Sequence, residues 1–421
     1  MKILLVYPQY PESFWSFKYA LKFIGLKASL PPLGLLSIAA LLPQQWEKKL
    51  VDMNVKKLKE SDLKWADYVM ISAMSIQQQS AREVISSCKE LGVRVIAGGP
   101  LFTAEPGRFK DVDHLILNEG ELTLPAFLED LEKGCPKHIY ATSEKPALDK
   151  TPVPLWELIK MRDYATMSVQ FSRGCPYDCE FCDITALFGR KPRLKKAPQI
   201  LQELDALYKG GWRGGVFVVD DNFIGNKAYL KKETLPAMID WMDKHKNPFW
   251  FITEASINLA DDEEIMLQMQ KAGFVSVFIG IETPSEESLK ECNKYHNVNR
   301  DMIACVKKIQ NFGMQVSGGF IVGFDSDTPS IFERQISFIQ NSGIVTAMVG
   351  MLQAPVGTKL FKRLKKEKRL LPDRGFSGNN TDLSINFVPK MSMEKLTEGY
   401  WRIVTTIYEP QNYYERVLEF F

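Results

Sequence analysis

Short hydrophobic runs recur along the first third of the chain and alternate with amphipathic stretches of helical periodicity. Such runs are typical of strands that are buried on both faces, and the stretches between them of helices that cover a parallel sheet. The predicted strands are Ile3 to Tyr7, Lys49 to Asp52, Tyr68 to Ser72, Val93 to Ala97 and His114 to Leu117. The pattern therefore predicts a five-stranded doubly wound α/β domain over residues 1–138.

Prolines and polar residues replace this pattern over residues 139–164, which is typical of a linker. A second αβ series follows over residues 165–355. Its predicted strands are Met167 to Ser172, Gly215 to Val219, Phe249 to Thr253, Val275 to Ile281, Gln315 to Val322 and Val345 to Leu352. Six βα units predict a partial, TIM-like (βα)6 barrel with its site at the carboxyl ends of the strands.

Residues 356–421 are expected to form a small basic and helical C-terminal region. Its charge is concentrated between Lys359 and Arg369, and a helix is predicted from about Ser392 to Ile407. The chain as a whole is balanced, with 53 Lys and Arg against 51 Asp and Glu. No global field would attract nucleic acid, so we expect no nucleic-acid partner.

The seven cysteines are odd in number, and three of them lie within eight positions. This usage favours free thiols in a reducing cytoplasm over a disulfide framework, so a cytoplasmic protein is expected. The longest apolar stretch, Leu30 to Leu42, contains Pro31, Pro32 and Gly34. It is shorter than the roughly 20 residues that a membrane-spanning helix needs.

Cys175, Cys179 and Cys182 have C-x3-C-x2-C spacing and directly follow a predicted strand. Thiolates are the ligands of iron-sulfur clusters, and three of them hold three irons of a 4Fe-4S cubane. The fourth iron stays open, so that a small molecule can chelate it through an amine and a carboxylate. A zinc site is the alternative, but it usually takes C-x2-C pairs and a fourth Cys or His, and the chain has only four histidines.

This motif and its surroundings resemble the radical S-adenosylmethionine enzymes, whose cysteine loop follows the first strand of a partial barrel. The resemblance implies S-adenosylmethionine as a cofactor and places Phe181 and the segment around Gly319 near its adenine. It implies that Asp221 and Asn222 meet the methionyl amine and that Glu254 and Glu282 contact the ribose. Carboxylates at strand ends are also often solvated or cap a helix, and that alternative stays open.

The front domain, a flavodoxin-like sheet ahead of such a barrel, resembles the cobalamin-binding domain of the cobalamin-dependent subgroup. The candidate cofactor contacts follow the strands and are Ser72, Gln77, Gly98, Gly99, Pro100, Glu119 and Gly120. Familiar domains of this kind supply a cobalt ligand from Asp-x-His-x-x-Gly, whereas this chain has Asp52-Met53-Asn54, so no histidine ligand is expected. Gly98 and Gly99 would admit the corrin or its nucleotide tail, or they form an ordinary strand-to-helix turn.

The segments Asp178 to Ile184, Gly189 to Arg193 and Asn386 to Pro389 resemble the subgroup that contains the bacterial hopanoid C-2 methylase. This resemblance implies a C-methyltransferase that acts on an unactivated carbon of a lipid or hopanoid-like substrate. A 5'-deoxyadenosyl radical would take a hydrogen atom, and methylcobalamin would supply the methyl group. Apart from the cofactors no catalytic residue is expected, and an electron donor such as flavodoxin or ferredoxin must reduce the cluster.

Two other functions stay open: ring formation or rearrangement without methyl transfer, and a cobalamin-responsive binding or regulatory protein. The basic run from Lys359 to Arg369, with the aromatic residues between Trp401 and Phe421, is typical of peripheral contact with anionic bilayers. A solvated basic helix is the alternative. Relatives usually continue past a tail like Tyr413 to Val417, so a segment that covers the substrate is expected to be missing or shortened.

Overall fold

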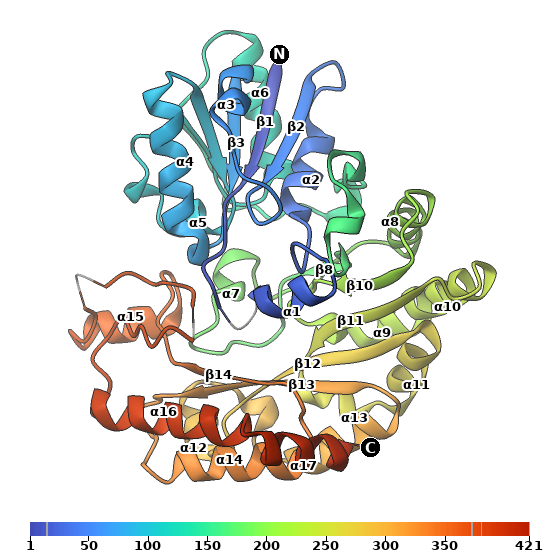
Figure 1. Ribbon diagram of the computed structural model, residues 1–421, viewed down its shortest axis with the longest axis vertical. Coiled ribbons are helices and arrows are strands. Elements are labelled where there is room, and N and C mark those ends of the chain that lie inside the picture. The colour runs from blue at the N-terminus through green and yellow to red at the C-terminus, as the bar shows by residue number, and fades with distance from the viewer. Residues whose placement is uncertain (14–15, 372–373, 380, 421) are drawn as a thin grey trace. The chain divides into compact units, whose positions relative to one another are not determined.

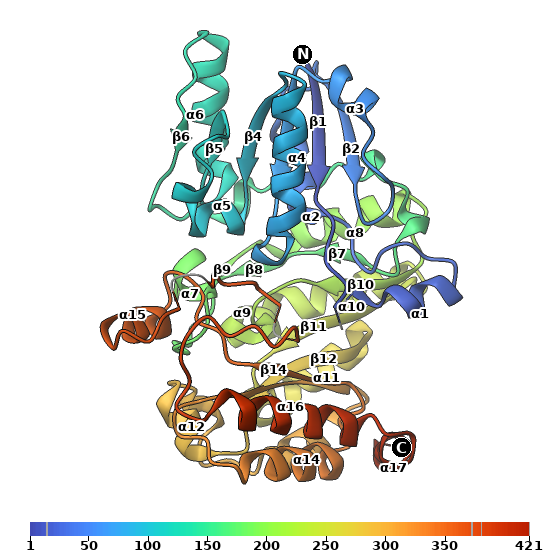
Figure 2. The ribbon, with the colours of Figure 1, turned by 60° about the vertical axis from the view of Figure 1, so that its left-hand side comes forward.

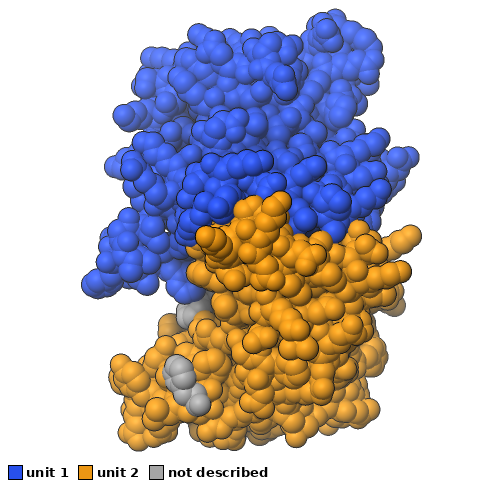
Figure 3. Space-filling view, turned by 90° about the vertical axis from the view of Figure 1, so that its right-hand side faces the viewer, with its two compact units in different colours: residues 1–169, 193–213 blue, residues 170–192, 214–421 orange. Residues whose placement is uncertain are grey.

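The computed structural model describes residues 1–13, 16–371, 374–379 and 381–420. The chain divides into two compact units, which Figure 3 colours separately. Unit 1 comprises residues 1–169 and 193–213, and unit 2 comprises residues 170–192 and 214–421. The finer domain boundaries expected from the sequence stay a prediction. No helix in the described parts of the chain is long and apolar enough to cross a membrane.

Unit 1 is built on a parallel sheet with the strand order β2-β1-β3-β4-β5-β6. Its strands are β1 (Lys2–Tyr7), β2 (Glu47–Asp52), β3 (Tyr68–Ser72), β4 (Arg94–Gly98), β5 (His114–Ile116) and β6 (Ile139–Tyr140). The five predicted strands are confirmed within two residues at either end, and β6 is a sixth strand that the sequence did not indicate. The strand order reverses beside β1, and in doubly wound sheets ligands bind beyond the carboxyl ends of the strands at such a point.

Helices cover both faces of this sheet, whereas α1 (Lys18–Phe23) and α8 (Ala197–Lys209) of the same unit lie away from it (Figure 1). The other helices of unit 1 are α2 (Leu33–Leu41), α3 (Glu60–Trp65), α4 (Gln78–Glu90), α5 (Pro100–Ala104) and α6 (Gly120–Glu132). Leu4 and Val6 of β1 pack in one core with Val84 of α4 and Phe102 of α5. The residues between them in β1 are equally buried, which explains why the strand is apolar throughout instead of alternating.

Unit 2 contains the strands of the second αβ series. They are β10 (Gly214–Val218), β11 (Phe249–Ala255), β12 (Phe274–Glu282), β13 (Gln315–Val322) and β14 (Ala347–Met351), and they pair in parallel in chain order. The predicted first strand of the series is split into β7 (Met167–Val169), which belongs to unit 1, and β8 (Ser172–Arg173), which belongs to unit 2; β9 (Arg193–Leu194) follows in unit 1. The α/β architecture with parallel sheets is confirmed.

Helices separate the strands of unit 2 and form its C-terminal region (Figure 2). They are α7 (Ile184–Leu187), α9 (Lys227–Tyr229), α10 (Leu235–Lys244), α11 (Glu263–Ala272), α12 (Glu286–Glu291), α13 (Met302–Asn311), α14 (Ile331–Ser342), α15 (Lys359–Lys366), α16 (Met393–Ile407) and α17 (Pro410–Phe420). The predicted C-terminal helix is confirmed as α16, and the Ser392 hydroxyl caps it. Phe421, one of the aromatic residues of the tail, lies outside the described residues.

Buried Arg416 attaches α17 to unit 2. Its guanidinium donates to the carbonyls of Ile407 at 2.6 Å and Val345 at 3.2 Å, and to Oε1 of Gln340 on α14 at 2.6 Å. The side chain is fully buried, so these acceptors replace the water that a cation would otherwise hold.

Candidate functional site

The three cysteines lie in the cysteine loop, residues 174–183, between β8 and α7. Burial raises the pKa of the thiols of Cys175, Cys179 and Cys182 above the ordinary value, and the Lys294 ammonium opposes that rise at Cys179. Thiols in such an environment stay protonated unless a cation compensates the thiolate charge. A partly buried set of three thiols therefore fits a metal group that neutralises them.

The cysteine loop is closed against the chain that follows α7. Gly174 has φ +92, and a Cβ there would lie 2.9 Å from the carbonyl oxygen of Gly189 and 3.1 Å from that of Lys191. The Cys175 amide donates to the same Gly189 oxygen at 3.3 Å. Only glycine fits this place, because any other residue meets both an unfavourable φ and two backbone oxygens.

Among the described residues, no three His, Cys, Asp or Glu side chains converge as the ligands of one metal ion would. A tetrahedral zinc site needs such convergence. In a cubane each thiolate binds a different iron, so the sulfur atoms stand farther apart. The donor set of three thiols fits a 4Fe-4S cluster with one open iron better than it fits zinc.

Carboxyl groups gather at the ends of β10 and β11. The Asp221 carboxylate accepts a bond from the Gly174 amide at 3.3 Å, which links the end of β10 to the cysteine loop. Burial raises the pKa of Asp221 to about 7, and burial with the charges of Asp221 and Asp220 raises that of Glu254 to about 8. Asp220 instead holds the chain just before β8, since it accepts from the Phe171 amide at 2.8 Å.

Asn222 and Phe181 also lie at this edge of unit 2. The Asn222 amide nitrogen lies 3.9 Å from the Cys175 sulfur, and its oxygen accepts from the Ser256 amide at 3.2 Å. The Phe181 ring lies 6.2 Å from that of Phe324, which follows β13. The structure thus brings Asp221, Asn222 and Phe181 together with the cysteines.

Glu282 lies in a different environment from the other predicted carboxylates. It has φ +63 and accepts a bond from the Lys294 ammonium at 2.6 Å, with both side chains about nine-tenths buried. Burial lowers the pKa of Lys294 while Glu282 and Cys179 raise it, and the net pKa lies above the ordinary value. Sequence reasoning missed Lys294, because no strand end or motif singles it out.

Gly319 lies within β13, and its lack of a side chain serves the packing of unit 2. A Cβ at this position would lie 2.7 Å from the Phe278 ring on β12. The neighbouring strand therefore fills the space beside Gly319 and requires glycine there, and its contact with the adenine stays a prediction.

In unit 1, Ser72 ends β3 and lies beside Gly98, which ends β4 and is followed by Gly99 and Pro100. Gly99 has φ +91, and a Cβ there would lie 2.7 Å from the Ser72 hydroxyl oxygen. A Cβ on Gly98 would lie 2.8 Å from the Ile116 carbonyl oxygen, and Pro100 begins α5. The strand-to-helix turn requires glycine at both places, and contact of this edge with cobalamin stays a prediction.

The other three predicted residues of unit 1 already have hydrogen-bond partners or packing contacts within that unit. Gln77 is fully buried, donates to the Pro8 carbonyl at 2.6 Å and accepts from the Met74 amide at 2.9 Å. The Glu119 carboxylate is held by both terminal nitrogens of Arg193 at 2.8 Å each. Gly120 begins α6, where a Cβ would lie 2.4 Å from the Ile38 side chain. Their contacts shape the edge of the sheet.

At the end of β2, where a cobalt-binding histidine would follow the aspartate, the chain forms a network of phenols. Asp52 accepts from the Tyr164 hydroxyl at 3.0 Å and from the Asn54 amide at 2.9 Å. The Tyr7 and Tyr10 hydroxyls are hydrogen-bonded to each other, and burial raises the pKa of Tyr10 to about 12. The absence of histidine was predicted, but the partner Tyr164 lies in the predicted linker and gave no signal.

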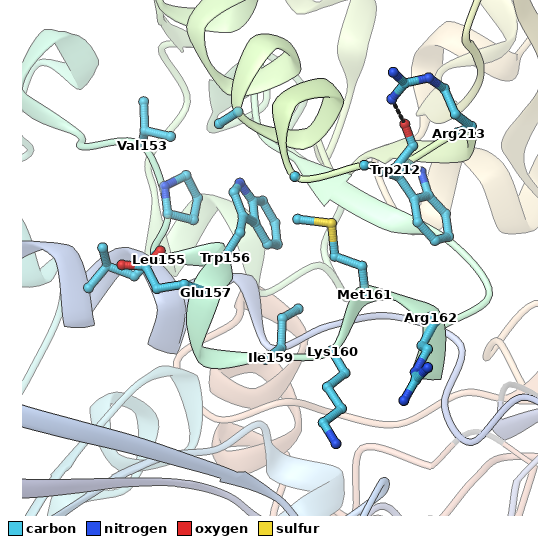
Figure 4. A pocket seen from close by; sticks show the side chains of 14 residues that line it. Val153, Leu155, Trp156, Glu157, Ile159, Lys160, Met161, Arg162, Trp212 and Arg213 are labelled. Carbon is cyan, nitrogen blue, oxygen red and sulfur yellow. Dashed lines mark hydrogen bonds between the residues drawn. The ribbon is translucent and has the colours of Figure 1, made fainter.

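A separate cavity of about 980 Å³ lies in unit 1 between residues 153–162 and the end of α8 (Figure 4). Trp156, Met161 and Trp212 form part of its wall, and the buried indole nitrogen of Trp156 has no hydrogen-bond partner. None of the predicted site residues lines this cavity.

Comparison with known proteins gives three domain matches. The B12 binding domain matches residues 24–128, the Radical SAM superfamily residues 169–339, and a domain of unknown function, DUF4070, residues 358–421. Together the first two domains account for all three predicted cofactors: a 4Fe-4S cluster, S-adenosylmethionine and cobalamin.

Two relatives match along nearly the whole chain. An uncharacterized methyltransferase of Synechocystis sp. is 45% identical over 99% of this chain and 78% of its own length. The hopanoid C-2 methylase of Rhodopseudomonas palustris is 36% identical over 92% of this chain and 73% of its own length. The fold is similar to that of the radical S-adenosylmethionine methyltransferase TsrM of Kitasatospora setae, with a TM-score of 0.68, 15% identity, and coverage of 88% of this chain and 76% of that one. The chain therefore belongs to the family of cobalamin-dependent radical S-adenosylmethionine methyltransferases.

Proposed function

We propose that this protein transfers a methyl group to an unactivated carbon of a lipid, of the hopanoid class or similar to it. The observation that carries the proposal is the 36% identity to the hopanoid C-2 methylase, which extends over 92% of the chain and includes both cofactor domains. When bound, the cluster and S-adenosylmethionine supply hydrogen abstraction, and cobalamin supplies the methyl group.

Within unit 2 we assign Cys175, Cys179 and Cys182 as the cluster ligands. Asp221 and Glu254 are suited to a cationic ligand, because both are acidic groups whose pKa values are raised by burial and by neighbouring carboxylates, and a cation would offset both effects. The ammonium group of S-adenosylmethionine would supply that positive charge. Asn222, which bonds to Ser256 through its oxygen, directs its amide nitrogen toward Cys175. Phe181 is assigned to the adenine, and Gly319 and Glu282 shape the neighbouring strands.

Within unit 1 we assign the edge formed by Ser72 and residues 98–100 to cobalamin. Gln77, Glu119 and Gly120 would act indirectly by holding the residues at this edge of the sheet, because their side chains or their packing are already engaged within unit 1. The Asp52 network consists of carboxylate, amide and phenol groups and contains no histidine. This position therefore offers no histidine ligand to the cobalt.

The structure changes the argument for a lipid substrate. Three of the seven basic residues in the run on which the sequence argument depended, Lys359, Arg363 and Arg369, pair with carboxylates of unit 2 and are not available to a bilayer. A different segment has the required character. The helix α1 and its flanks expose Phe17 by 40%, Tyr19 by 68%, Phe23 by 91% and Ile24 by 67%.

Aromatic and aliphatic side chains with lysines among them are typical of segments that lie in the headgroup region of a bilayer. Lys18 and Lys22 supply the cations in this segment. We therefore propose that α1, and not α15, contacts an anionic bilayer from which the substrate is taken.

Methyl-labelled S-adenosylmethionine tests the function. The reduced, reconstituted holoenzyme is incubated with hopanoid lipids, and label in the lipid supports methyl transfer. Formation of 5'-deoxyadenosine that depends on the lipid, without label in any product, would reject methylation in favour of ring formation or rearrangement. No 5'-deoxyadenosine at all would favour a binding or regulatory protein. The variant with all three cysteines changed to Ala is expected to lose cleavage and keep cobalamin binding.

Sedimentation with phosphatidylglycerol vesicles tests the bilayer contact. The variant Phe23→Ser with Ile24→Ser should lose most of its vesicle binding, because it removes two strongly exposed apolar side chains at the end of α1. Tyr295→Ser is the matched control, since Tyr295 is 63% exposed on unit 2 and lies in no such segment. Equal binding of both variants would reject α1 as the contact.

A further inference from the structure

Helix α15 begins the domain of unknown function and packs on the cysteine loop (Figure 2). The Leu360 amide donates to the carbonyl of Glu180, the residue between Cys179 and Phe181, at 2.9 Å. Leu360 and Leu364 are buried on the inner side of the helix. The helix therefore has a packed inner side, while Lys362, Lys365 and Lys366 on its outer side are exposed.

Arg363 connects this helix to the cysteine loop through its side chain. Its Nε donates to Oε1 of Glu180 at 2.7 Å and its Nη2 to Oε2 at 3.0 Å, so the guanidinium binds both carboxylate oxygens. The remaining terminal nitrogen, Nη1, donates to Asp325 at 2.9 Å. Because the guanidinium is planar and its donors are fixed, such a paired contact sets the position of the carboxylate as well as its charge.

A second group of contacts fixes the other members of this network. Arg369 donates to both oxygens of Asp325, at 2.6 and 2.7 Å. The Asp325 amide in turn donates to Glu291 at 3.0 Å. Lys359 pairs with Asp178, which lies between Cys175 and Cys179. Both intervals between the cysteines are therefore bound by basic residues of the C-terminal region.

Glu180 itself is held from three sides. Its amide donates to the Cys292 carbonyl at 2.8 Å, its carbonyl accepts from Leu360, and its carboxylate is taken by Arg363. The side chain is 11% exposed, so without Arg363 the carboxylate would lack its cation in a poorly solvated place and the loop would shift to reach water.

We infer that Arg363 is a positioning residue for the cysteine loop, and that α15 gives residues 358–421 the role of fixing the spacing of the cluster ligands. The inference rests on the assignment of the three cysteines as those ligands. Metal ligands keep their geometry through the residues that hold them in turn, and removal of such support typically weakens metal binding by about 10- to 100-fold.

The test compares Arg363→Met, which keeps the apolar stem, with Arg363→Lys, which keeps the charge without the paired contact. Lys366→Met is the matched control, because Lys366 is an exposed cation of the same helix that makes no ion pair within the described residues. The first readout is amide hydrogen exchange of residues 175–189 in the apoprotein. We expect exchange about tenfold faster or more in Arg363→Met, intermediate in Arg363→Lys and unchanged in Lys366→Met.

The second readout is the rate at which the reconstituted protein loses iron to a chelator, expected to rise in the same order. Arg363→Met with wild-type exchange and wild-type iron retention would overturn the inference. The double variant Arg363→Met with Glu180→Gln separates positioning from charge neutralisation, since it removes the buried charge but not the need for a fixed loop. If it retains iron like the wild type, Arg363 only neutralises Glu180 and the inference is wrong.

Amides of β12 and β13 serve as an internal reference for general unfolding. If these amides also exchange faster in Arg363→Met, the substitution has destabilised unit 2 in general. The double variant then decides, because removing the buried charge of Glu180 restores general stability without restoring the contact that fixes the loop. A wild-type protein that takes up no iron would contradict the assignment of the cysteines, while the exchange result would still report on the contact between α15 and the loop.

Discussion

Replacement of Gly174 by alanine tests how the cysteine loop is shaped. The added Cβ would lie 2.9 Å from one backbone oxygen and 3.1 Å from another, at a φ of +92. A non-glycine residue at positive φ costs about 1–2 kcal/mol. An inserted methyl that forces backbone to move costs a further 1–3 kcal/mol or so. The sum is about 2–5 kcal/mol against the closed loop.

Gly189→Ala is the matched control from the other end of the same closure. Gly189 has a similar φ of +86, but a Cβ there would meet no atom within 4 Å. Only the conformational cost of about 1–2 kcal/mol applies to it. The difference between the two variants isolates the contact with the carbonyl oxygens, which corresponds to roughly tenfold or more in the equilibrium between closed and open loop.

Amide hydrogen exchange at Cys175 in the apoprotein measures this opening, because that amide donates to Gly189 across the closure. We expect both variants to exchange faster than the wild type, with Gly174→Ala the faster of the two by about that factor. The reconstituted Gly174→Ala protein should also lose iron first. Equal exchange in both variants would refute the argument from the backbone contacts, and slower exchange in Gly174→Ala would refute it more strongly.

Three further results are expected. The pKa of Glu254 is near its ordinary value of 4.5 in the unfolded chain and about 8 in the folded chain, so the wild-type apoprotein loses stability as pH rises from about 4.5 to 8. Glu254→Gln should therefore have a higher Tm than the wild type at pH 8.5 and the same Tm at pH 4. A difference in Tm that does not change with pH would contradict this. Lys294→Met leaves the carboxylate of Glu282 buried without its ammonium partner and should cost about 3–5 kcal/mol in denaturant unfolding of the apoprotein, much of it recovered when Glu282→Gln is added. Arg416→Met removes charged hydrogen bonds worth about 1.5–3 kcal/mol each, so limited proteolysis should release α17 while the rest of the chain resists; wild-type resistance of α17 would show that the bonds are dispensable.

The strands of unit 1 could be predicted because its sheet is buried on both faces, which makes central strands such as β1 and β3 continuous apolar runs. In unit 2 burial alternates along β11 and β13, and these strands were predicted from apolar stretches that recur between helical patterns. Tyr68 to Ser72 and Gln315 to Val322 match β3 and β13 to the residue. Where a strand is too short to give either pattern, the prediction was wrong or incomplete. β6 has only Ile139 and Tyr140, in a stretch of prolines and polar residues, and the first strand of the second series is interrupted after Val169.

Local spacing located the three cysteines, whereas contacts between distant residues could not be seen in the sequence. Glu119 was predicted to contact a cofactor because it follows a strand, yet its carboxylate binds Arg193, 74 residues further on. The basic run was interpreted from its charge alone, since the partners of Arg363 lie in the cysteine loop and after β13. A strand end predicts where a polar side chain lies, but not which partner the fold gives it.

Unit 1 is discontinuous, because residues 193–213 belong to it and residues 170–192 do not. A gene fragment that stops before the cysteine loop would omit Arg193 and α8, and with them the partner of Glu119 and part of the wall of the cavity beside Trp156. Unit 1, which contains the B12 binding domain, therefore cannot be expressed as one continuous fragment of the chain. Its independent expression would require residues 169 and 193 to be rejoined by a short designed bridge in place of the segment that carries the thiols.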